Sequence, residues 1–411
     1  MGYQNSGNRS GPSHSGNYNG DNYGNNKDIG NGFDLAHNLQ TTYIDFLKFI
    51  DAFNRFKDIC KKESVKTAWE NATVEDKKYI LDLANLYDKQ KSVFEEIEKL
   101  ISNNVWIEYF WKLYSERKTL EKVGWIDFES EISRIIQTLD QARTTILKEI
   151  KQGKKTGRMT QYQCDILSPL WGKNGMNHEM ISFEEKSITY RKKQFLKDLN
   201  RITRCLEIYL GEFVEGIKPQ VKLPDIEKLD INCVLSFNYT HTYERLYDLD
   251  KSKSVKYDYI HGEIRKNSTF ENCNLILGID EYLEGEEKTK SNEFIQFKKF
   301  YQRIYKRTGC KYVDWIKTNE EWLKRYSKVK TSENYIYILG HSLDITDGDI
   351  LSTLINMPHT RTTIFYHNQE SLGNQISNLV KILGEDELIS MVHGENAQIV
   401  FKEQQKEVAV K

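Results

Sequence analysis

The residues of this chain best suited to chemistry begin with a glycine-rich turn, Gly30, Asn31, Gly32, Phe33 and Asp34, directly before a long amphipathic segment. Glycine lets a backbone bend sharply and approach a phosphate, and a helix starting at once adds N–H donors and partial positive charge. The third glycine of the dinucleotide fingerprint is absent, so spacing alone also fits an ordinary loop-to-helix turn. In that alternative, Asp34 only favours the helix start.

Two further polar side chains, Asn238 and His261, each follow a short apolar run much later in the chain. An asparagine amide donates and accepts hydrogen bonds, so Asn238 is suited to orient a water molecule or a sugar hydroxyl. A histidine titrates near neutral pH, so His261 is suited to take a proton from that water or hydroxyl. The structural alternatives are a turn residue at 238 and a hydrogen-bonded histidine at a strand end at 261.

The apolar pattern after Pro224 predicts the strands that position these side chains. Five short runs are apolar almost throughout and stop at polar clusters: Ile231–Phe237, Val255–Ile260, Leu275–Leu277, Tyr335–Leu339 and Thr362–Tyr366. Such runs fit strands buried on both faces of a mostly parallel sheet, whose ligands bind outside the carboxyl ends of the strands. We therefore expect Gly340, His341 and Ser342, which end the fourth run, to lie near Asn238 and His261.

The segment before Pro224 is helical in pattern. Tyr43, Phe46, Leu47 and Ile50 recur at the spacing of one helix face, and similar faces follow. We expect one α/β domain over residues 29–400 with a helical insertion over about 41–224. The Gly-, Asn- and Ser-rich residues 1–28 are predicted to form a disordered tail, and residues 401–411 a flexible one.

Composition narrows the class of protein. The 411 residues carry a formal net charge of −1, which argues against bulk capture of nucleic acid or of an anionic membrane. No apolar run approaches the roughly 18 residues that cross a bilayer, and no signal peptide opens the chain. Six scattered cysteines without CxxC pairs indicate reduced thiols in a cytoplasmic protein and no zinc site.

Two charged stretches have both a structural and a functional interpretation. Asp344, Asp347 and Asp349 could suggest a metal site, but their spacing at a helix start favours capping, and we predict no metal. Between Phe294 and Arg307, one helical face is apolar, namely Phe294, Phe297, Tyr301 and Ile304. Most of the basic residues lie off it: Lys298, Lys299, Arg303, Lys306 and Arg307. A solvated charged face over a packed apolar one is predicted there, and a nucleic-acid surface is the alternative.

Several strings together resemble one protein family. GNGFDLAHNLQTTYIDFL, which starts at Gly30, resembles the opening motif of the AbiH family of bacterial phage-abortive-infection proteins. SFNYTHTYERLY, YIHGEI, LILGID and YILGHSLDITDGDIL resemble its later blocks in the same order, and WIDFESEI also fits. The resemblance covers about residues 29 to 400. It implies antiphage defence, with a phage-derived trigger and a homo-oligomer as partners to consider.

The AbiH blocks are in turn similar to sirtuin-like NAD-consuming domains. That resemblance implies a Rossmann-like (sirtuin-like) sheet with NAD as substrate or ligand, Asn238 as the sirtuin-type asparagine and His261 as the general base. It places Gly30 and Gly32 in a phosphate turn and the residues from Gly340 to Ser342 in a late nucleotide-binding loop.

This chain departs from the sirtuin pattern at two positions. Thr240 stands where an aspartate is expected, and polar residues precede Ile29 where an apolar strand is expected. The implied activity is hydrolysis of the nicotinamide–ribose bond of NAD. The alternatives are a non-catalytic module that senses a nucleotide or ADP-ribose and an effector that acts on nucleic acid.

Overall fold

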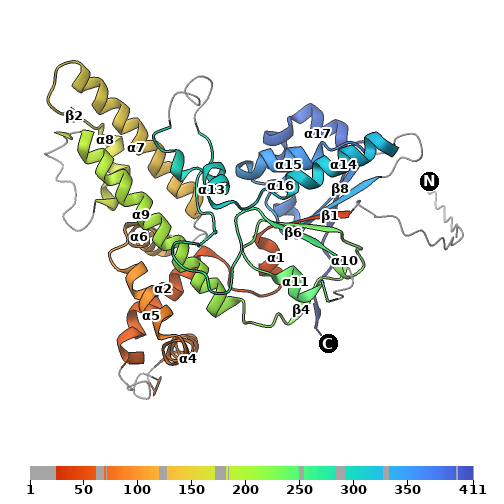
Figure 1. Cartoon of the computed structure of the whole chain (residues 1–411), viewed down its shortest axis with the longest axis horizontal. Helices are drawn as coiled ribbons and strands as arrows, with labels where there is room; N and C mark the ends of the chain where they lie inside the picture. Colours follow the sequence, from red (N-terminus) through yellow and green to blue (C-terminus); the bar gives the residue numbers. More distant parts are fainter. Residues whose placement is uncertain are drawn as a thin grey trace, which may run out of the picture.

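The computed structural model describes residues 25–61, 69–70, 72–119, 127–171, 182–183, 185–249, 254–282, 292–326, 333–394 and 397–410. A part built on a β-sheet lies beside a part built from long helices (Figure 1). Among the described residues, no helix has the length and apolar character needed to span a bilayer.

Six strands of the described chain form one sheet in which every neighbouring pair is parallel. They are β1 (Asn25–Ile29), β5 (Cys233–Ser236), β6 (Lys256–Tyr259), β7 (Asn334–Leu339), β8 (Thr360–Tyr366) and β9 (Ile399–Glu403). Their order is β6-β5-β1-β7-β8-β9, so the first strand lies in the middle. The predicted parallel sheet is confirmed. Along the chain, β5 and β6 are added on one side of β1, and β7, β8 and β9 on the other side.

Both ends of the sheet domain extend beyond the predicted limits. Residues 1–24 of the predicted disordered tail lie outside the described residues, but residues 25–28 belong to the central strand β1. Its backbone pairs with β5 on one side and β7 on the other, so neighbouring strands, and not an apolar run, define it. Residues 401–411 were predicted to be flexible, yet β9 extends to Glu403 and β10 (Val408–Ala409) pairs with β4 (Val221–Lys222).

Helices cover both faces of the sheet. One face packs against α1 (Asn31–Ala36), α10 (Pro224–Glu227) and α11 (Thr242–Leu246). The other packs against α14 (Tyr312–Tyr326), α15 (Gly348–Ile355), α16 (Gln369–Leu383) and α17 (Glu385–Val392). Val234 and Leu235 are consecutive in β5 and enter different cores, because successive side chains of a strand point to opposite faces. Strand β5 is therefore buried on both faces, as its apolar run predicts.

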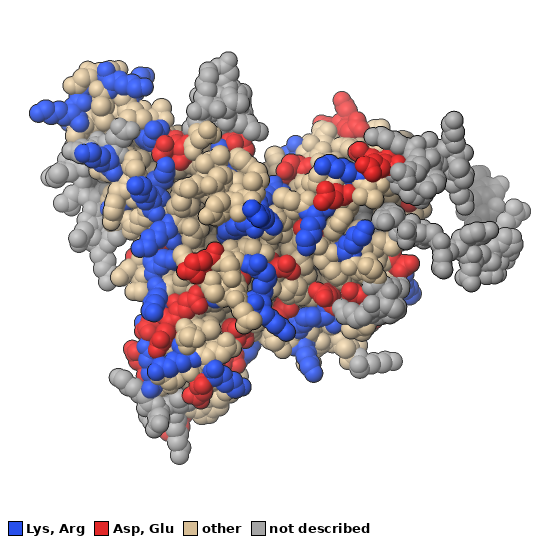
Figure 2. Space-filling model, viewed as in Figure 1, with Lys and Arg blue, Asp and Glu red and all other residues tan. Residues whose placement is uncertain are grey.

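The helical part lies between β1 and β5 in the sequence, as predicted for the insertion. It contains α2 (Tyr43–Lys61), α4 (Val74–Lys89), α5 (Lys91–Ile101), α6 (Val105–Thr119), α7 (Phe128–Lys151), α8 (Gln161–Leu167) and α9 (Glu185–Tyr209), with a short pair of β2 (Gly157–Arg158) and β3 (Ser182–Phe183). On the face drawn in Figure 2, Lys and Arg gather along the upper helical part, whereas both charges are mixed over the sheet part.

A later segment of the chain joins the helical core. Leu277, Ile279, Phe294 and Phe297 are buried among the aromatic and aliphatic side chains of the insertion. Leu275–Leu277 was predicted to be a strand, but it forms no strand of the sheet, and Leu277 packs into this core. The helix α13 (Lys299–Lys306) follows and lies between the two parts (Figure 1).

Candidate functional site

The glycine turn, residues 30–32, packs against the chain that leaves β7. The N–H of Gly32 donates to the carbonyl of Gly340 (2.8 Å), and that of Gly30 donates to the last carbonyl of β7 (3.1 Å). A Cβ on Gly30 would lie 2.6 Å from His341 Cα, and one on Gly340 only 2.0 Å from Phe33 N. The glycines thus permit contact between two backbones, and the N–H groups of Gly30 and Gly32 are bonded within the chain.

Asn238 lies against this turn, as the sequence predicts. Its Nδ2 donates to the carbonyl of Gly30 (3.0 Å), and its backbone N–H donates to Ser236 Oγ (3.1 Å). The side chain is buried at the carboxyl end of β5. An asparagine amide carries two donor hydrogens and an acceptor oxygen, so the bond to Gly30 does not use its full capacity.

Asp34 is buried beside Asn238 with one oxygen unused. Its Oδ2 accepts a hydrogen bond from Thr240 Oγ1 (2.6 Å), and Thr240 Oγ1 is 3.1 Å from Thr242 Oγ1. Because Thr240 has one hydroxyl hydrogen, Thr242 is the donor of that second bond. Asp34 Oδ1 has no hydrogen-bond partner among the described residues. Burial raises the pKa of the Asp34 carboxyl to about 6, against the opposing hydrogen bond from Thr240.

A small cavity adjoins this carboxylate. Its lining consists of Phe33, Asp34, Val234, Ser236, Asn238, Thr240, Thr242, Tyr243 and Tyr259. The cavity has room for about one water molecule, far less than a dinucleotide needs. Asn238, Thr240, Phe33 and Asp34 therefore meet at one hollow, but the hollow alone does not hold a nucleotide.

His261 lies in a second group of polar side chains, around Asp347 at the start of α15. His261 Nε2 is 3.2 Å from Asp347 Oδ1, and His341 Nε2 is 3.7 Å from Asp347 Oδ2. His341 Nδ1 accepts a hydrogen bond from the N–H of Leu343 (2.8 Å), which places any single ring proton on Nε2. Burial lowers the pKa of His341 to about 4, so this imidazole is neutral at neutral pH.

The other nitrogen of His261 has no partner. Its Nδ1 is buried and makes no hydrogen bond with any described residue. An unsatisfied buried polar atom costs about 1–3 kcal/mol, so Nδ1 needs a partner from outside the described residues, such as a water molecule or a ligand. With a proton on Nε2 facing Asp347, Nδ1 is left as an acceptor.

Lys299 connects this group to the helical part. Its Nζ is 2.7 Å from Glu129 Oε2 of α7 and 3.7 Å from Asp347 Oδ1. Burial alone would lower the pKa of Lys299, but Asp347, Glu129 and Asp280 raise it above its usual range. Burial raises the pKa of Asp280 to about 7. Lys299 thus contacts the carboxyl groups of Glu129 and Asp347 and interacts electrostatically with that of Asp280.

The solvated charged face predicted between Phe294 and Arg307 is wrong at Lys298 and Lys299. Lys298 and Lys299 are 2% and 3% exposed, and Lys298 Nζ is 2.6 Å from Glu281 Oε1. Ile304, assigned to the packed face, is 70% exposed. The segment lies between two parts of the fold, so burial is set by the acidic residues it meets and not by its own helical periodicity.

The aspartates after β7 also differ among themselves. Asp344 accepts a hydrogen bond from the N–H of Thr346 (3.0 Å) and caps a short helix, as predicted. Asp347 makes no capping bond with its side chain and instead faces His261 and Lys299. Among the described residues, no three His, Cys, Asp or Glu side chains form a group that could hold a metal ion.

The sequence predictions missed Glu129, Asp280, Lys299 and Asp347 as members of the site. Glu129 belongs to the WIDFESEI string, Asp280 to LILGID and Asp347 to YILGHSLDITDGDIL, so family-like motifs did contain three of them. Ser342, predicted for the nucleotide loop, is exposed at the edge of the group. His261 does not line the cavity beside Asp34. Its ring instead packs against the ring of Phe237, at 5.6 Å between centroids.

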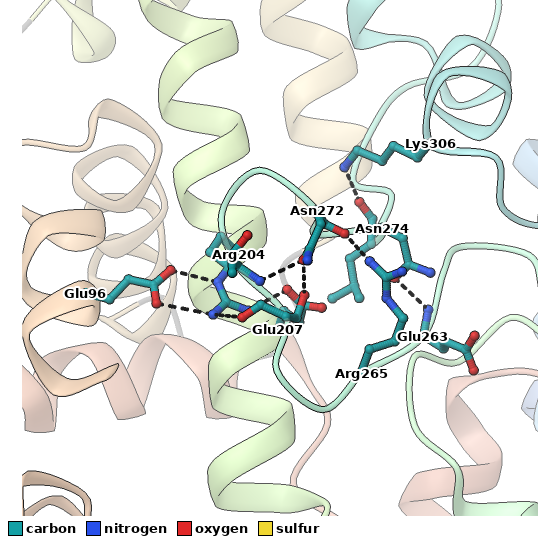
Figure 3. A network of polar contacts seen from close by, with 11 residues as sticks. Glu96, Arg204, Glu207, Glu263, Arg265, Asn272, Asn274 and Lys306 are labelled. Carbon is teal, nitrogen blue, oxygen red and sulfur yellow. Dashed lines mark hydrogen bonds and ion pairs between the residues drawn. The ribbon is translucent and has the colours of Figure 1, made fainter. Parts of the chain in front are cut away.

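A polar network holds the loop that follows His261. Figure 3 shows Arg204 of α9 between Glu96 and Glu207, at 2.8 Å and 2.7 Å, and its Nη2 also donates to the carbonyl of Ser268 (2.8 Å). The loop returns so that the N–H of Ile276 donates to the carbonyl of His261 (2.8 Å). The helical part therefore positions the chain on the far side of His261.

We predict that Gly340→Ala strongly destabilises the protein. The residue has φ +63°, and the added Cβ would lie 2.0 Å from Phe33 N, so the cost should exceed the roughly 1–2 kcal/mol of the left-handed conformation. Gly373→Ala in α16 is the matched control, because its Cβ meets nothing within 4 Å and alanine favours a helix. Urea denaturation should show a loss only for Gly340→Ala; equal midpoints would refute the close contact.

Asp34→Asn is expected to stabilise the protein at pH 7.5. Because folding raises the pKa from 3.8 to about 6, the protonated carboxyl favours the fold below pH 4, and this contribution is lost as pH rises through 6. Asparagine resembles the protonated form, so the gain approaches about 3 kcal/mol at pH 7.5 and vanishes near pH 4. Denaturation of both proteins across this range measures it; a gain independent of pH would contradict the burial of a charge.

Lys299→Met should cost about 3–5 kcal/mol, because it leaves buried carboxylates without their ammonium partner. Lys154→Met is the control, since Lys154 pairs with Glu149 at 2.9 Å but its side chain is 56% exposed. That exposed pair should be worth less than about 1 kcal/mol. Similar losses in the two variants, measured by urea denaturation, would show that Lys299 is not the central cation.

Comparison with known proteins assigns the family. A family model described as bacteriophage abortive infection AbiH matches residues 29–367, which is most of the chain. No curated protein matches the chain. The matched range includes the glycine turn, Asn238, His261 and Asp347, together with the helical part between β1 and β5. The chain therefore belongs to the AbiH family of bacteriophage abortive infection proteins.

Proposed function

We propose that this AbiH protein stops phage infection by hydrolysing the nicotinamide–ribose bond of NAD. The family gives the biological role, abortive infection as antiphage defence. The observation that carries the proposed chemistry is the buried His261–Asp347 pair at the end of β6, in which His261 Nδ1 has no partner among the described residues. A carboxylate that orients an imidazole and leaves one nitrogen as acceptor is suited to general-base catalysis.

The strand order supports a Rossmann-like (sirtuin-like) nucleotide site. Numbered along the chain within the sheet, the order β6-β5-β1-β7-β8-β9 is 3-2-1-4-5-6, the order of many dinucleotide-binding sheets. Such sheets bind their ligand where the order reverses, here outside the ends of β1 and β7. The glycine turn and the Gly340 loop occupy that position. NAD, as substrate or ligand, would lie over them.

The charge of the His261 group also suits this reaction. Nicotinamide leaves readily from ribose, so the enzyme must mainly align a water molecule and stabilise positive charge that develops on the sugar. Despite burial, Lys299 keeps the pKa of Asp347 well below its usual range, so this group holds an ionised carboxylate 3.2 Å from His261. In the proposed reaction Asn238 orients the ribose or the water, and His261 accepts a proton from a hydroxyl or from water.

A second candidate function is a non-catalytic module that senses a nucleotide or ADP-ribose and regulates a partner. The observations that favour it are the internal bonds of the Gly30 and Gly32 N–H groups and the bond from Thr240 to Asp34, in place of the sirtuin-type aspartate. Calorimetry distinguishes the two, because the sensing module binds NAD or ADP-ribose tightly without turnover.

The test is nicotinamide release from NAD by the purified protein, with and without lysate from phage-infected cells to supply a trigger. We expect His261→Ala to lower kcat by about 10²–10⁴ and Asn238→Ala by about 10²–10³. His367→Ala is the matched control, because His367 also follows a strand, β8, but is exposed. Equal turnover by the wild type, His261→Ala and Asn238→Ala would remove both residues from the mechanism.

A further inference from the structure

The cavity beside Asp34 is the feature of the site that the proposed function leaves without a role. Asp34 is 1% exposed, yet its Oδ1 has no described partner, and Oδ1 is the free acceptor of a carboxylate that lines the cavity. Hydroxyl groups of Thr240 and Thr242 form a chain of hydrogen bonds that ends on Oδ2, so the carboxylate is held in place. The space fits about one water molecule.

We propose that this cavity holds the water molecule that attacks the ribose, and that Asp34 takes the proton from it. The proposal rests on the proposed function and refines it. Asp34 becomes the catalytic base toward water, and His261 is left to bind a ribose hydroxyl. Asn238 lies beside the proposed water, because it lines the cavity. Its side chain also donates a hydrogen bond to the carbonyl of Gly30.

The position of His261 favours separate roles for His261 and Asp34. His261 does not line the cavity, and the ring of Phe237 packs against both His261 and His341, at 5.6 Å and 4.4 Å between centroids. Phe237 belongs to the core on the α15 face, whereas Phe33 and Tyr243, which line the cavity, belong to the core on the α1 face. The two acceptors thus approach the carboxyl edge of the sheet from different cores.

The step balances without any co-reactant. The water oxygen forms a bond to C1′ of the nicotinamide-bearing ribose, and the bond from C1′ to the pyridinium nitrogen breaks. The electron pair of that bond leaves with nicotinamide, which departs neutral. The water proton passes to Asp34 Oδ1 and then to solvent, so the products are ADP-ribose, nicotinamide and one proton.

The ionisation of Asp34 suits this role at neutral pH. A carboxyl whose pKa is about 6 is ionised at pH 7 and is a stronger base than an exposed aspartate. The titratable groups that face it are Glu215, Tyr243 and Tyr259. Burial raises the pKa of Glu215, but hydrogen bonds with His241 and the charge of Arg245 keep it below its usual value. Glu215 therefore does not titrate in the same range as Asp34.

The first test compares NAD hydrolysis by the wild type, Asp34→Asn and Asp258→Asn. We expect Asp34→Asn to lower kcat by about 10²–10⁴ with little change in KM, because asparagine keeps the shape and removes the base. Asp258→Asn is the matched control: Asp258 is also a buried carboxyl with a raised pKa, but it accepts a bond from the N–H of Tyr312 away from the cavity. Denaturation at the assay pH verifies that each variant is folded.

Thr240→Val provides a readout that a purely structural role would not change. Valine removes the hydroxyl that donates to Asp34 and keeps the carboxyl, so the pKa of Asp34 should rise. The acid limb of the kcat profile, expected near pH 6 in the wild type, should move up by about one pH unit. A limb that stays in place in Thr240→Val would assign it to another group and overturn the proposal.

A crystal structure gives a readout that needs no activity. One ordered water within hydrogen-bond distance of Asp34 Oδ1 is expected, and a dry cavity would overturn the proposal while the proposed function stood. The same holds if Asp34→Asn hydrolyses NAD within a few-fold of the wild type and His261→Ala does not. A wild type that releases no nicotinamide in any condition would remove the proposed function and this inference together.

Discussion

Two backbone hydrogen bonds, from the glycine turn to the chain that leaves β7, bring two strand ends together with no side chain between them. The contact is possible because a Cβ on Gly30 or Gly340 would overlap the facing backbone. It fixes the start of α1, and with it Asp34, against the end of β5, where Asn238 bonds to the Gly30 carbonyl. Phe33 and Asp34, which line the cavity, follow this turn directly in α1.

A buried cluster of opposite charges connects the sheet part to the helical part. Lys299 contacts Glu129 of α7 and Asp347, the residue directly before α15, so one ammonium group joins the two parts of the fold. Buried ion pairs contribute little net stability but are costly to break, which favours one relative placement over alternatives. The Arg204 network acts on the other side of the same loop (Figure 3). The imidazole of His261 is thus positioned by residues from both parts.

The fold could be predicted where side chains carry the signal. The buried faces of α2 and α7 follow helical spacing, and β5, β7 and β8 lie in apolar runs, because these elements bury their own side chains. Strand β1 has the polar sequence NNKDI and is defined by backbone pairing to β5 and β7. Leu275–Leu277 has the composition of a strand but forms no strand of the sheet, and Leu277 packs into the helical core. Local composition does not contain the information about which neighbour a segment meets.

The candidate site, too, could be predicted from the sequence only in part. The sequence by itself determined which residues end the strands, namely the glycine turn, Asn238, His261 and the Gly340 loop, and the parallel sheet that brings those ends to one edge. Only the tertiary structure decided that Asn238 joins the Asp34 cavity while His261 joins Asp347 and Lys299. The physical reason is that burial and charge pairing depend on distant segments: Glu129 and Lys299 resemble solvated helix residues until the fold places their charged groups 2.7 Å apart.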